Sequence, residues 1–506
     1  ATNSTRLDTN SYIFQARFNS ATWTGQLLAF NLNNDGSIGS QAWDASTLIP
    51  AENSRNIFSY DSTSGSSTGI IFEYANLNTT QQLLMDTDSS GTTDTLGSNR
   101  TDYIRGDTSN EQNNGGPFRD RVSLLGDVIN SDPWFSGHVE DFGYTQLANT
   151  TEASAYPAHL TAKLTRTPAV YFSANDGMLH AVNATSEPTD SSYSSRGVEL
   201  FSYVPDATIG ALSTLTDPFY GCGGAGCIPH RYFVDGAPRG GDAYFSSAWH
   251  SVLVTTLGAG GKGLFALDVT NPSSFSASNV LWEISDAQAP NPSDVGSFAA
   301  DLGYTLPQAS IVKMQDGSWA AVVANGYESA NNSAVLFLID IQTGHILKKI
   351  DTGVGSAGNP NGLSTPIAVD EDGDKVTDSI YAGDLLGNLW KFDVSGNNTS
   401  TWKVAYGTNP SPAPLYQALD GSGTPQPITA KPQVGKHPSG GLMVYFGTGK
   451  YYAVNDQIVG PSPQIHTFYG IRDQGSAVAS RTNLLQQEIL TEKTFEVTAS
   501  NVIQTP

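Results

Sequence analysis

Short apolar segments that alternate with polar positions and end in Asn or Asp recur along the chain. Each copy places its Asn or Asp six residues after a turn position, which most often holds glycine. Side chains of a β-strand alternate between its two faces, so a period of two bounded by turn residues predicts hairpins of an antiparallel sheet. The copies are GQLLAFN (25–31), GMLHAVN (177–183), KGLFALD (262–268), AVLFLID (334–340), GNLWKFD (387–393) and GKYYAVN (449–455).

A further strand pattern follows four of the copies, as in VLWEIS (280–285) and HILKKI (345–350). Small antiparallel sheets in series are typical of radial repetition, because closing the ring protects the sheet edges. The copies start 152, 85, 72, 53 and 62 residues apart, against about 40–45 residues for a minimal propeller blade. We therefore predict an all-β fold, a modified β-propeller with loop insertions, in which six repeats are clear and seven blades are expected.

The long first gap between copies suggests a division of the chain near residue 150. We expect residues 1–150 to form an N-terminal blade or closure region, and residues 151–506 to form the main body of what is a single propeller overall. The only convincing helical pattern is TNLLQQEILTEKTF (482–495).

The charge balance restricts the partners that the chain can have. Lys and Arg total 25 against 48 Asp and Glu, a net charge of −23. Such a surface repels phosphate backbones and anionic membranes, so nucleic acid is not an expected partner and hard cations are the natural counter-ions. No apolar run approaches the roughly 20 residues that span a bilayer.

Two cysteines, Cys222 and Cys227, lie five positions apart in a glycine-rich stretch. This spacing favours a small disulfide loop over structural zinc, which needs two further ligands where only His230 is near. A disulfide favours an oxidising compartment. The chain begins without an initiator Met or a signal-peptide core, which we interpret as a mature or excised portion of an exported protein.

The stretch DEDGDKVTD (370–378) has the spacing of a calcium loop. Ca²⁺ takes 6–8 oxygen ligands, which a short loop supplies from alternate positions together with one backbone carbonyl at position 7. A solvated acidic turn is the alternative, but four carboxylates this close repel one another without a cation. The predicted ligands are the side chains of Asp370, Asp372, Asp374 and Asp378 and the carbonyl of Val376.

Two departures separate this loop from an EF-hand. Position 6 holds Lys375 in place of Gly, and position 12 holds Tyr381 in place of the bidentate Glu. The flanking segments read as strands, so we predict a calcium loop within a β-hairpin of one blade.

A second stretch, DTDSSGTTD (86–94), offers a weaker match. Glycine stands at position 6, where a calcium loop turns sharply, but only three carboxylates are available. A plain polar loop is the alternative, because such mixtures are common in turns. The predicted ligands are Asp86, Asp88, Ser90, Thr92 and Asp94.

The tripeptide Arg105, Gly106 and Asp107 is the sequence that integrins read on exposed loops, although from the residues alone a structural role is favoured.

An oxidoreductase is a less favoured alternative, since propellers can host quinone dehydrogenases. Those enzymes typically stack the quinone on a disulfide between adjacent cysteines, whereas Cys222 and Cys227 are separated. We therefore expect no enzymatic activity.

Several motifs, in order, resemble the PilC/PilY family of type IV pilus biogenesis factors and tip adhesins. The resemblance extends over roughly residues 100–473. The motifs include FRDRVSLLGDVINSDP (118–133), VYFSANDGMLHAVNA (170–184), LGAGGKGLFALDVTNP (257–272), YAGDLLGNLWKFD (381–393) and MVYFGTGKYY (443–452).

The resemblance implies a modified seven-bladed propeller that forms the C-terminal part of a larger exported protein. It implies Ca²⁺ at residues 370–378 and a second site at residues 86–94, just before the RGD tripeptide. It further implies pilins or minor pilins as partners, with a host integrin as an additional one. Such a protein is expected at the pilus tip or cell surface, in the periplasm or at the outer membrane, where calcium regulates pilus extension and retraction, twitching motility and attachment.

Overall fold

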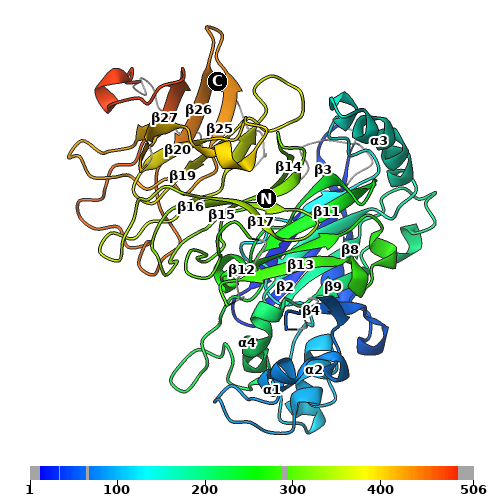
Figure 1. Ribbon diagram of the computed structural model, residues 1–506. Coiled ribbons are helices and arrows are strands. Elements are labelled where there is room, and N and C mark those ends of the chain that lie inside the picture. The colour runs from blue at the N-terminus through cyan, green and yellow to red at the C-terminus, as the bar shows by residue number, and fades with distance from the viewer. Residues whose placement is uncertain (1–11, 34, 64–67, 288–293, 409, 488–506) are drawn as a thin grey trace.

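The computed structural model describes residues 12–33, 35–63, 68–287, 294–408 and 410–487, and strands dominate them. Three consecutive sheets have four antiparallel strands in chain order, and β24 (Tyr416–Gln417) also pairs with one strand of the third (Figure 1). They are β10 (Arg239–Phe245), β11 (Ala248–Thr256), β12 (Gly263–Asp268) and β13 (Val280–Ser285); β14 (Ser310–Lys313), β15 (Trp319–Ala324), β16 (Val335–Asp340) and β17 (Ile346–Asp351); and β18 (Ile367–Val369), β19 (Ser379–Gly383), β20 (Asn388–Asp393) and β21 (Lys403–Val404).

Three further sheets precede and follow these. The first has three strands, the second runs in the order β5-β4-β9-β8-β7-β6, and the last has three strands after the small hairpin β22–β23. The strands are β1 (Tyr12–Asn19), β2 (Thr24–Leu32) and β3 (Ile38–Asp44); β4 (Ile57–Asp61), β5 (Thr68–Ile71), β6 (Trp134–Ser136), β7 (Ala169–Ala174), β8 (Met178–Asn183) and β9 (Glu199–Tyr203); β22 (Tyr406–Thr408) and β23 (Ser411–Ala413); and β25 (Gln433–Lys436), β26 (Leu442–Gly447) and β27 (Phe468–Asp473).

Consecutive sheets pack face to face in chain order, as a propeller requires. One hydrophobic cluster joins each neighbouring pair: the first sheet with β6–β9, β6–β9 with β10–β13, β10–β13 with β14–β17, β14–β17 with β18–β21, and β18–β21 with the last sheet. Strands such as β15 and β16 are buried on both faces, which explains why they read as continuous apolar runs. The structure therefore confirms the predicted β-propeller class.

The recurring sequence copy corresponds to one position in the blades. In β8, β12, β16 and β20 it is the third strand of a four-stranded array, and its last residue accepts a hydrogen bond from a backbone N–H just beyond the strand. These short Asx turns begin the connection to the fourth strand. The acceptor residues, with the N···O distances, are Asn183 (2.9 Å), Asp268 (3.0 Å), Asp340 (2.8 Å) and Asp393 (3.1 Å).

The prediction that residues 449–455 form a blade strand is wrong, because this segment is not a strand. Tyr451 and Val454 are 79% and 89% exposed, so its apolar residues face no sheet. The third strand of the last sheet is β27, whose Asp473 accepts from Gly475 N at 3.0 Å in the same kind of turn. The described residues form six sheets of three or more strands, and the seventh blade stays a prediction.

The described residues contain four α-helices between the strands, which contradicts the expectation of a single helical stretch near the C-terminus. The first two are short, with seven and nine residues, and α1 begins with a capping box between Asn78 and Gln81. Of the predicted helix, residues 488–495 lie outside the described residues, and the part before them holds only a short 3₁₀ turn, Arg481–Asn483. The helices are α1 (Thr79–Met85), α2 (Gly97–Arg105), α3 (Thr150–Lys163) and α4 (Asp206–Thr216).

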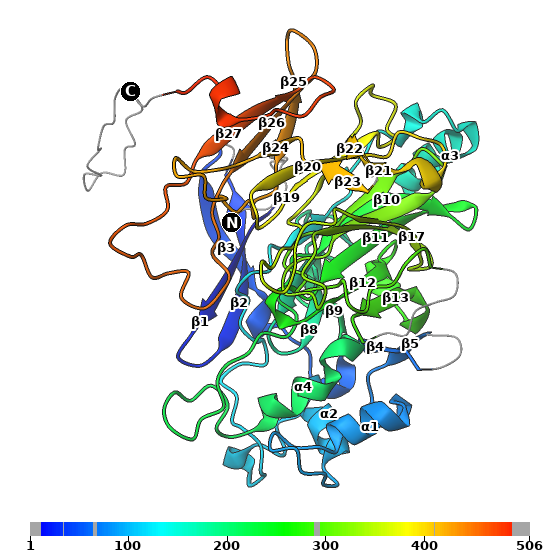
Figure 2. The same ribbon diagram turned by 60° about the vertical axis from the view of Figure 1, so that its left-hand side comes forward.

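Helices α1, α2 and α4 gather at one end of the molecule (Figure 2), below the sheet that contains β4 and β9. The pairing of β4 with β9 is parallel and joins residues from both sides of position 150 in one sheet. Buried charges hold this junction: the Nε of Arg55 lies 2.7 Å from Glu199 Oε1, and His180 Nδ1 lies 2.7 Å from Glu199 Oε2.

The imidazole of His180 gives this junction a pH dependence. Burial lowers the pKa of His180, but Asp176 and Glu199, which contact its two ring nitrogens, outweigh burial and raise the pKa to about 9. The unfolded value is about 6.5. A raised folded pKa contributes stability that is fully present below the unfolded pKa and is lost as pH rises through the folded one.

We expect the free energy of unfolding to fall by on the order of 3 kcal/mol between pH 6.5 and 9 because of His180. Urea unfolding at a series of pH values measures this fall. His180→Gln should lower stability at pH 6.5 and remove most of the fall, whereas His466→Gln, on an exposed side chain, should change neither. Parallel pH curves for the wild type and His180→Gln would contradict the assignment.

Candidate metal centre

The acidic loop at residues 370–378 connects β18 to β19, as the sequence predicts. Asp378 N donates to Val369 O at 2.9 Å and closes the base of the hairpin. Thr377 N donates to Lys313 O at 2.9 Å, so the loop is also fixed to the neighbouring sheet. At position 6, Lys375 adopts the positive φ (73°) for which calcium loops normally use glycine.

Three of the predicted ligands converge. Carboxylate oxygens of Asp370, Asp372 and Asp374 all lie within 4.8 Å of one another, half-buried or exposed. Backbone N–H groups of the loop donate to all three: Gly373 N to Asp370 at 2.6 Å, Asp374 N to Asp372 at 3.1 Å, and Val376 N to Asp374 at 2.8 Å. Within the described parts of the chain, this is the only group of three or more His, Cys, Asp or Glu residues placed to hold a metal ion.

Asp378 lies apart from this group. Its carboxylate accepts from Glu371 N at 2.8 Å and from Gln315 Nε2 at 3.0 Å. Burial, with repulsion from Asp372 and Asp374, raises the pKa of Asp378 above its ordinary value. The structure thus brings together three of the four predicted carboxylates and gives the fourth protein partners.

No basic side chain among the described residues neutralises the three converging carboxylates. Among the described residues, no ion pair involves Asp370, Asp372 or Asp374. The end of the Lys375 side chain lies against Gly143. Lys391 is engaged elsewhere on the same sheet, 3.2 Å from Glu371 and 3.0 Å from Asp473. A cluster of hard oxygen donors without its own cation is chemically suited to Ca²⁺.

The second acidic loop, residues 86–94, has a different arrangement, because it lies between helices α1 and α2. Asp94 forms a bidentate ion pair with Arg100, with N···O distances of 2.8 and 2.5 Å. Asp86 accepts from Tyr74 Oη at 2.8 Å and from Gly97 N at 3.0 Å. The third carboxylate, Asp88, accepts from Ser90 N and Thr92 N within its own turn. The structure therefore does not bring these carboxylates to one point.

The RGD tripeptide ends helix α2 and is largely built into the protein. Arg105 is 5% exposed; its Nε lies 2.9 Å from Glu52 Oε1, and it also donates to Phe72 O at 2.9 Å. Gly106 adopts φ +120° where the helix stops, and Asp107 accepts from Ser109 N at 2.9 Å. An integrin reads an exposed Arg, so this geometry favours the structural role of the tripeptide.

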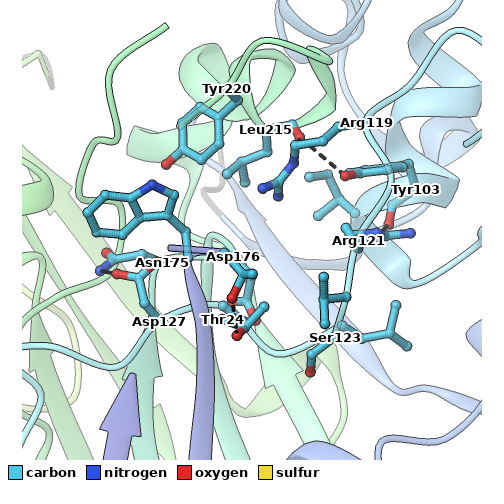
Figure 3. A pocket seen from close by; sticks show the side chains of 16 residues that line it. Thr24, Tyr103, Arg119, Arg121, Ser123, Asp127, Asn175, Asp176, Leu215 and Tyr220 are labelled. Atoms are coloured by element: carbon cyan, nitrogen blue, oxygen red, sulfur yellow. Dashed lines mark hydrogen bonds between the residues drawn. The ribbon is translucent and has the colours of Figure 1, made fainter. Parts of the chain in front are cut away.

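Cys222 and Cys227 form a disulfide, and the loop that they close lies beside a cavity that the sequence did not indicate. Trp23 stacks on His230 at 3.7 Å and donates to Gly221 O at 3.0 Å. In the same cavity the Arg119 guanidinium lies 5.0 Å from the ring of Tyr220 (Figure 3). No signal in the sequence could have found this cavity, because its residues come from distant segments.

Comparison with known proteins identifies relatives over almost the whole chain. Residues 125–505 match the family model described as the PilY1 beta-propeller domain. The type IV pilus biogenesis factor PilY1 of Pseudomonas aeruginosa strain PAK is 38% identical, over 97% of this chain and 42% of that protein. The PilY1 homolog of Xylella fastidiosa is 36% identical, over 92% of this chain and 32% of its own length.

A solved structure supports the same relationship. The crystal structure of the Pseudomonas aeruginosa PilY1 C-terminal domain matches with a TM-score of 0.55 and 36% identity, over 69% of this chain and 68% of that one. The chain spans less than half the length of the curated relatives that it matches.

These findings decide between the classes of protein considered above. The matched proteins are pilus biogenesis factors, a non-enzymatic family, so the quinone dehydrogenase alternative is not supported. No helix among the described residues has the length and apolar character needed to cross a membrane. The chain belongs to the family of PilY1 type IV pilus biogenesis factors and contains their β-propeller domain.

Proposed function

We propose that this propeller binds Ca²⁺ at Asp370, Asp372 and Asp374 and thereby regulates a type IV pilus biogenesis factor and tip adhesin. The observation that carries the proposal is the convergence of three carboxylates with which no basic side chain of the described residues forms an ion pair. Calcium would control pilus extension and retraction, twitching motility and attachment to surfaces. The partners are pilins or minor pilins, and the protein is exported to the pilus tip or cell surface, in contact with the periplasm and outer membrane.

The ligand chemistry supports calcium over softer metals. The loop offers only oxygen atoms, which suit a hard cation, and it contains neither His nor Cys. Asp378 and the carbonyl of Val376 are the further ligands that the spacing predicts. Bound calcium would cancel the mutual repulsion of the carboxylates and stabilise the folded loop by mass action.

The position of the loop explains how calcium bound there could affect the binding of a partner protein. Its backbone contacts Lys313 of the neighbouring sheet, and Gln315 of that sheet donates to Asp378. Calcium would therefore order a surface that spans two sheets of the propeller. A pilin that binds only the ordered surface senses calcium through its differential affinity for the two states.

Asp372→Asn removes one charged ligand, and we expect the affinity for calcium to fall about tenfold or more, which corresponds to about 1.4 kcal/mol. Isothermal titration calorimetry of the purified chain measures this change. Asp316→Asn is the matched control, because Asp316 is an exposed aspartate in a turn of the neighbouring sheet that, among the described residues, accepts only from Ser318. Equal affinities for the Asp372→Asn variant and the wild type would rule out the site.

Integrin binding through Arg105 and Asp107 is the alternative function, and the burial of Arg105 opposes it. We expect Arg105→Ala to lower the free energy of unfolding by about 3 kcal/mol, because Glu52 loses its partner in a largely buried pair. Chemical denaturation measures this loss. Asp107→Glu should remain folded and bind integrin-coated surfaces no differently from wild type; a stable Arg105→Ala variant that loses such binding would restore the adhesin reading.

A further inference from the structure

The loop at residues 86–94 has calcium-loop spacing, and the family resemblance implies a second calcium site there. Helix α1 ends directly before the loop, and helix α2 begins shortly after it. Within the loop, Asp88 N donates to Thr92 O at 2.9 Å in a tight turn around Gly91. Something must compensate the charge of three aspartates within nine residues.

Arg100 supplies this compensation from inside the fold. It belongs to α2 and is 3% exposed. Its guanidinium donates to both carboxylate oxygens of Asp94, at 2.8 and 2.5 Å, and to the carbonyl of Met85 at 2.9 Å. A single buried cation thus binds the last acid of the loop and the C-terminal end of α1, where helix carbonyls carry partial negative charge.

The remaining carboxylates are also satisfied by the protein. Asp86 is held by Tyr74 Oη and Gly97 N, and Asp88 is held by the N–H groups of its own turn. Calcium would have to take Asp86 from Tyr74 and Asp94 from Arg100. It would also place two positive charges beside a guanidinium that is almost removed from water, which is electrostatically unfavourable.

We propose that Arg100 takes the place of a metal ion in this loop, so that the α1–α2 unit is held without calcium and calcium sensing is confined to residues 370–378. The residues therefore do not fit the second site that the resemblance implies. The same helix α2 ends in buried Arg105, so Arg100 and Arg105 together anchor it to the protein. In this arrangement the α1–α2 unit is a permanent structural element.

Calcium titration by calorimetry of the full chain tests this, with Asp372→Asn, Asp94→Asn and the double variant. The expected result is one site, which Asp372→Asn weakens and Asp94→Asn does not affect. A calcium site that survives in Asp372→Asn and disappears in the double variant would overturn the inference. A chain that binds no calcium would overturn the proposed function and leave standing the role of Arg100 at residues 86–94. A second site at residues 86–94 would overturn the role of Arg100 and leave the proposed function standing.

Arg100→Gln provides a second measurement. Without the guanidinium, Asp94 is released, and we expect calcium to raise the thermal midpoint of Asp372→Asn/Arg100→Gln by more than it raises that of Asp372→Asn. Arg17→Gln in the Asp372→Asn background is the control, since Arg17 is exposed and donates only to Gln15 among the described residues. A folded double variant without a calcium response would contradict the role given to Arg100. If that variant does not fold, the titration of the aspartate variants decides.

Discussion

The compensation of negative charge is the constraint on which this structure depends. With 48 acidic residues and 25 Lys and Arg, at least 23 carboxylates have no basic residue of their own. Buried acids take the available cations, as in the pairs Arg55–Glu199, Lys163–Asp242 and Lys313–Glu152. Strand-end aspartates instead accept backbone N–H groups in short turns, which needs no charge from elsewhere. The converging carboxylates of residues 370–374 also accept backbone N–H groups, but no Lys, Arg or His of the described residues forms an ion pair with them, which is why we propose calcium there.

Two loops with nearly the same spacing of aspartates therefore differ in chemistry, because a basic side chain contacts the aspartates of one loop and not those of the other. At residues 86–94 a helix follows the loop, and its second turn places Arg100 against Asp94. At residues 370–378 strand β19 follows, and the nearby Lys391 is already paired with Asp473. Spacing identifies which oxygen atoms are available in a loop. The secondary structure around the loop decides whether a cationic side chain of the protein reaches them.

Much of the fold could be predicted from the sequence, because blade strands repeat one local pattern with a turn-forming Asn or Asp at its end. The pattern failed at residues 449–455, where alternation occurs without a sheet to bury it, and it missed β27, whose sequence is interrupted by Gly470. The helices were not predicted from the sequence, because capping and tertiary contacts, rather than apolar periodicity, determine them. The convergence at residues 370–374 was predictable from spacing. The burial of Arg105 was not, because its partner Glu52 comes from a distant segment.

The link between Thr377 and the carbonyl of Lys313 makes the acidic loop part of two sheets at once. Local opening of a protein proceeds in cooperative units, and a hydrogen bond that crosses a boundary couples the units on either side. Opening of β18–β19 would therefore break a contact with β14, although these strands lie in different blades. An ion bound in a loop of one blade would lengthen the lifetime of the closed state in both.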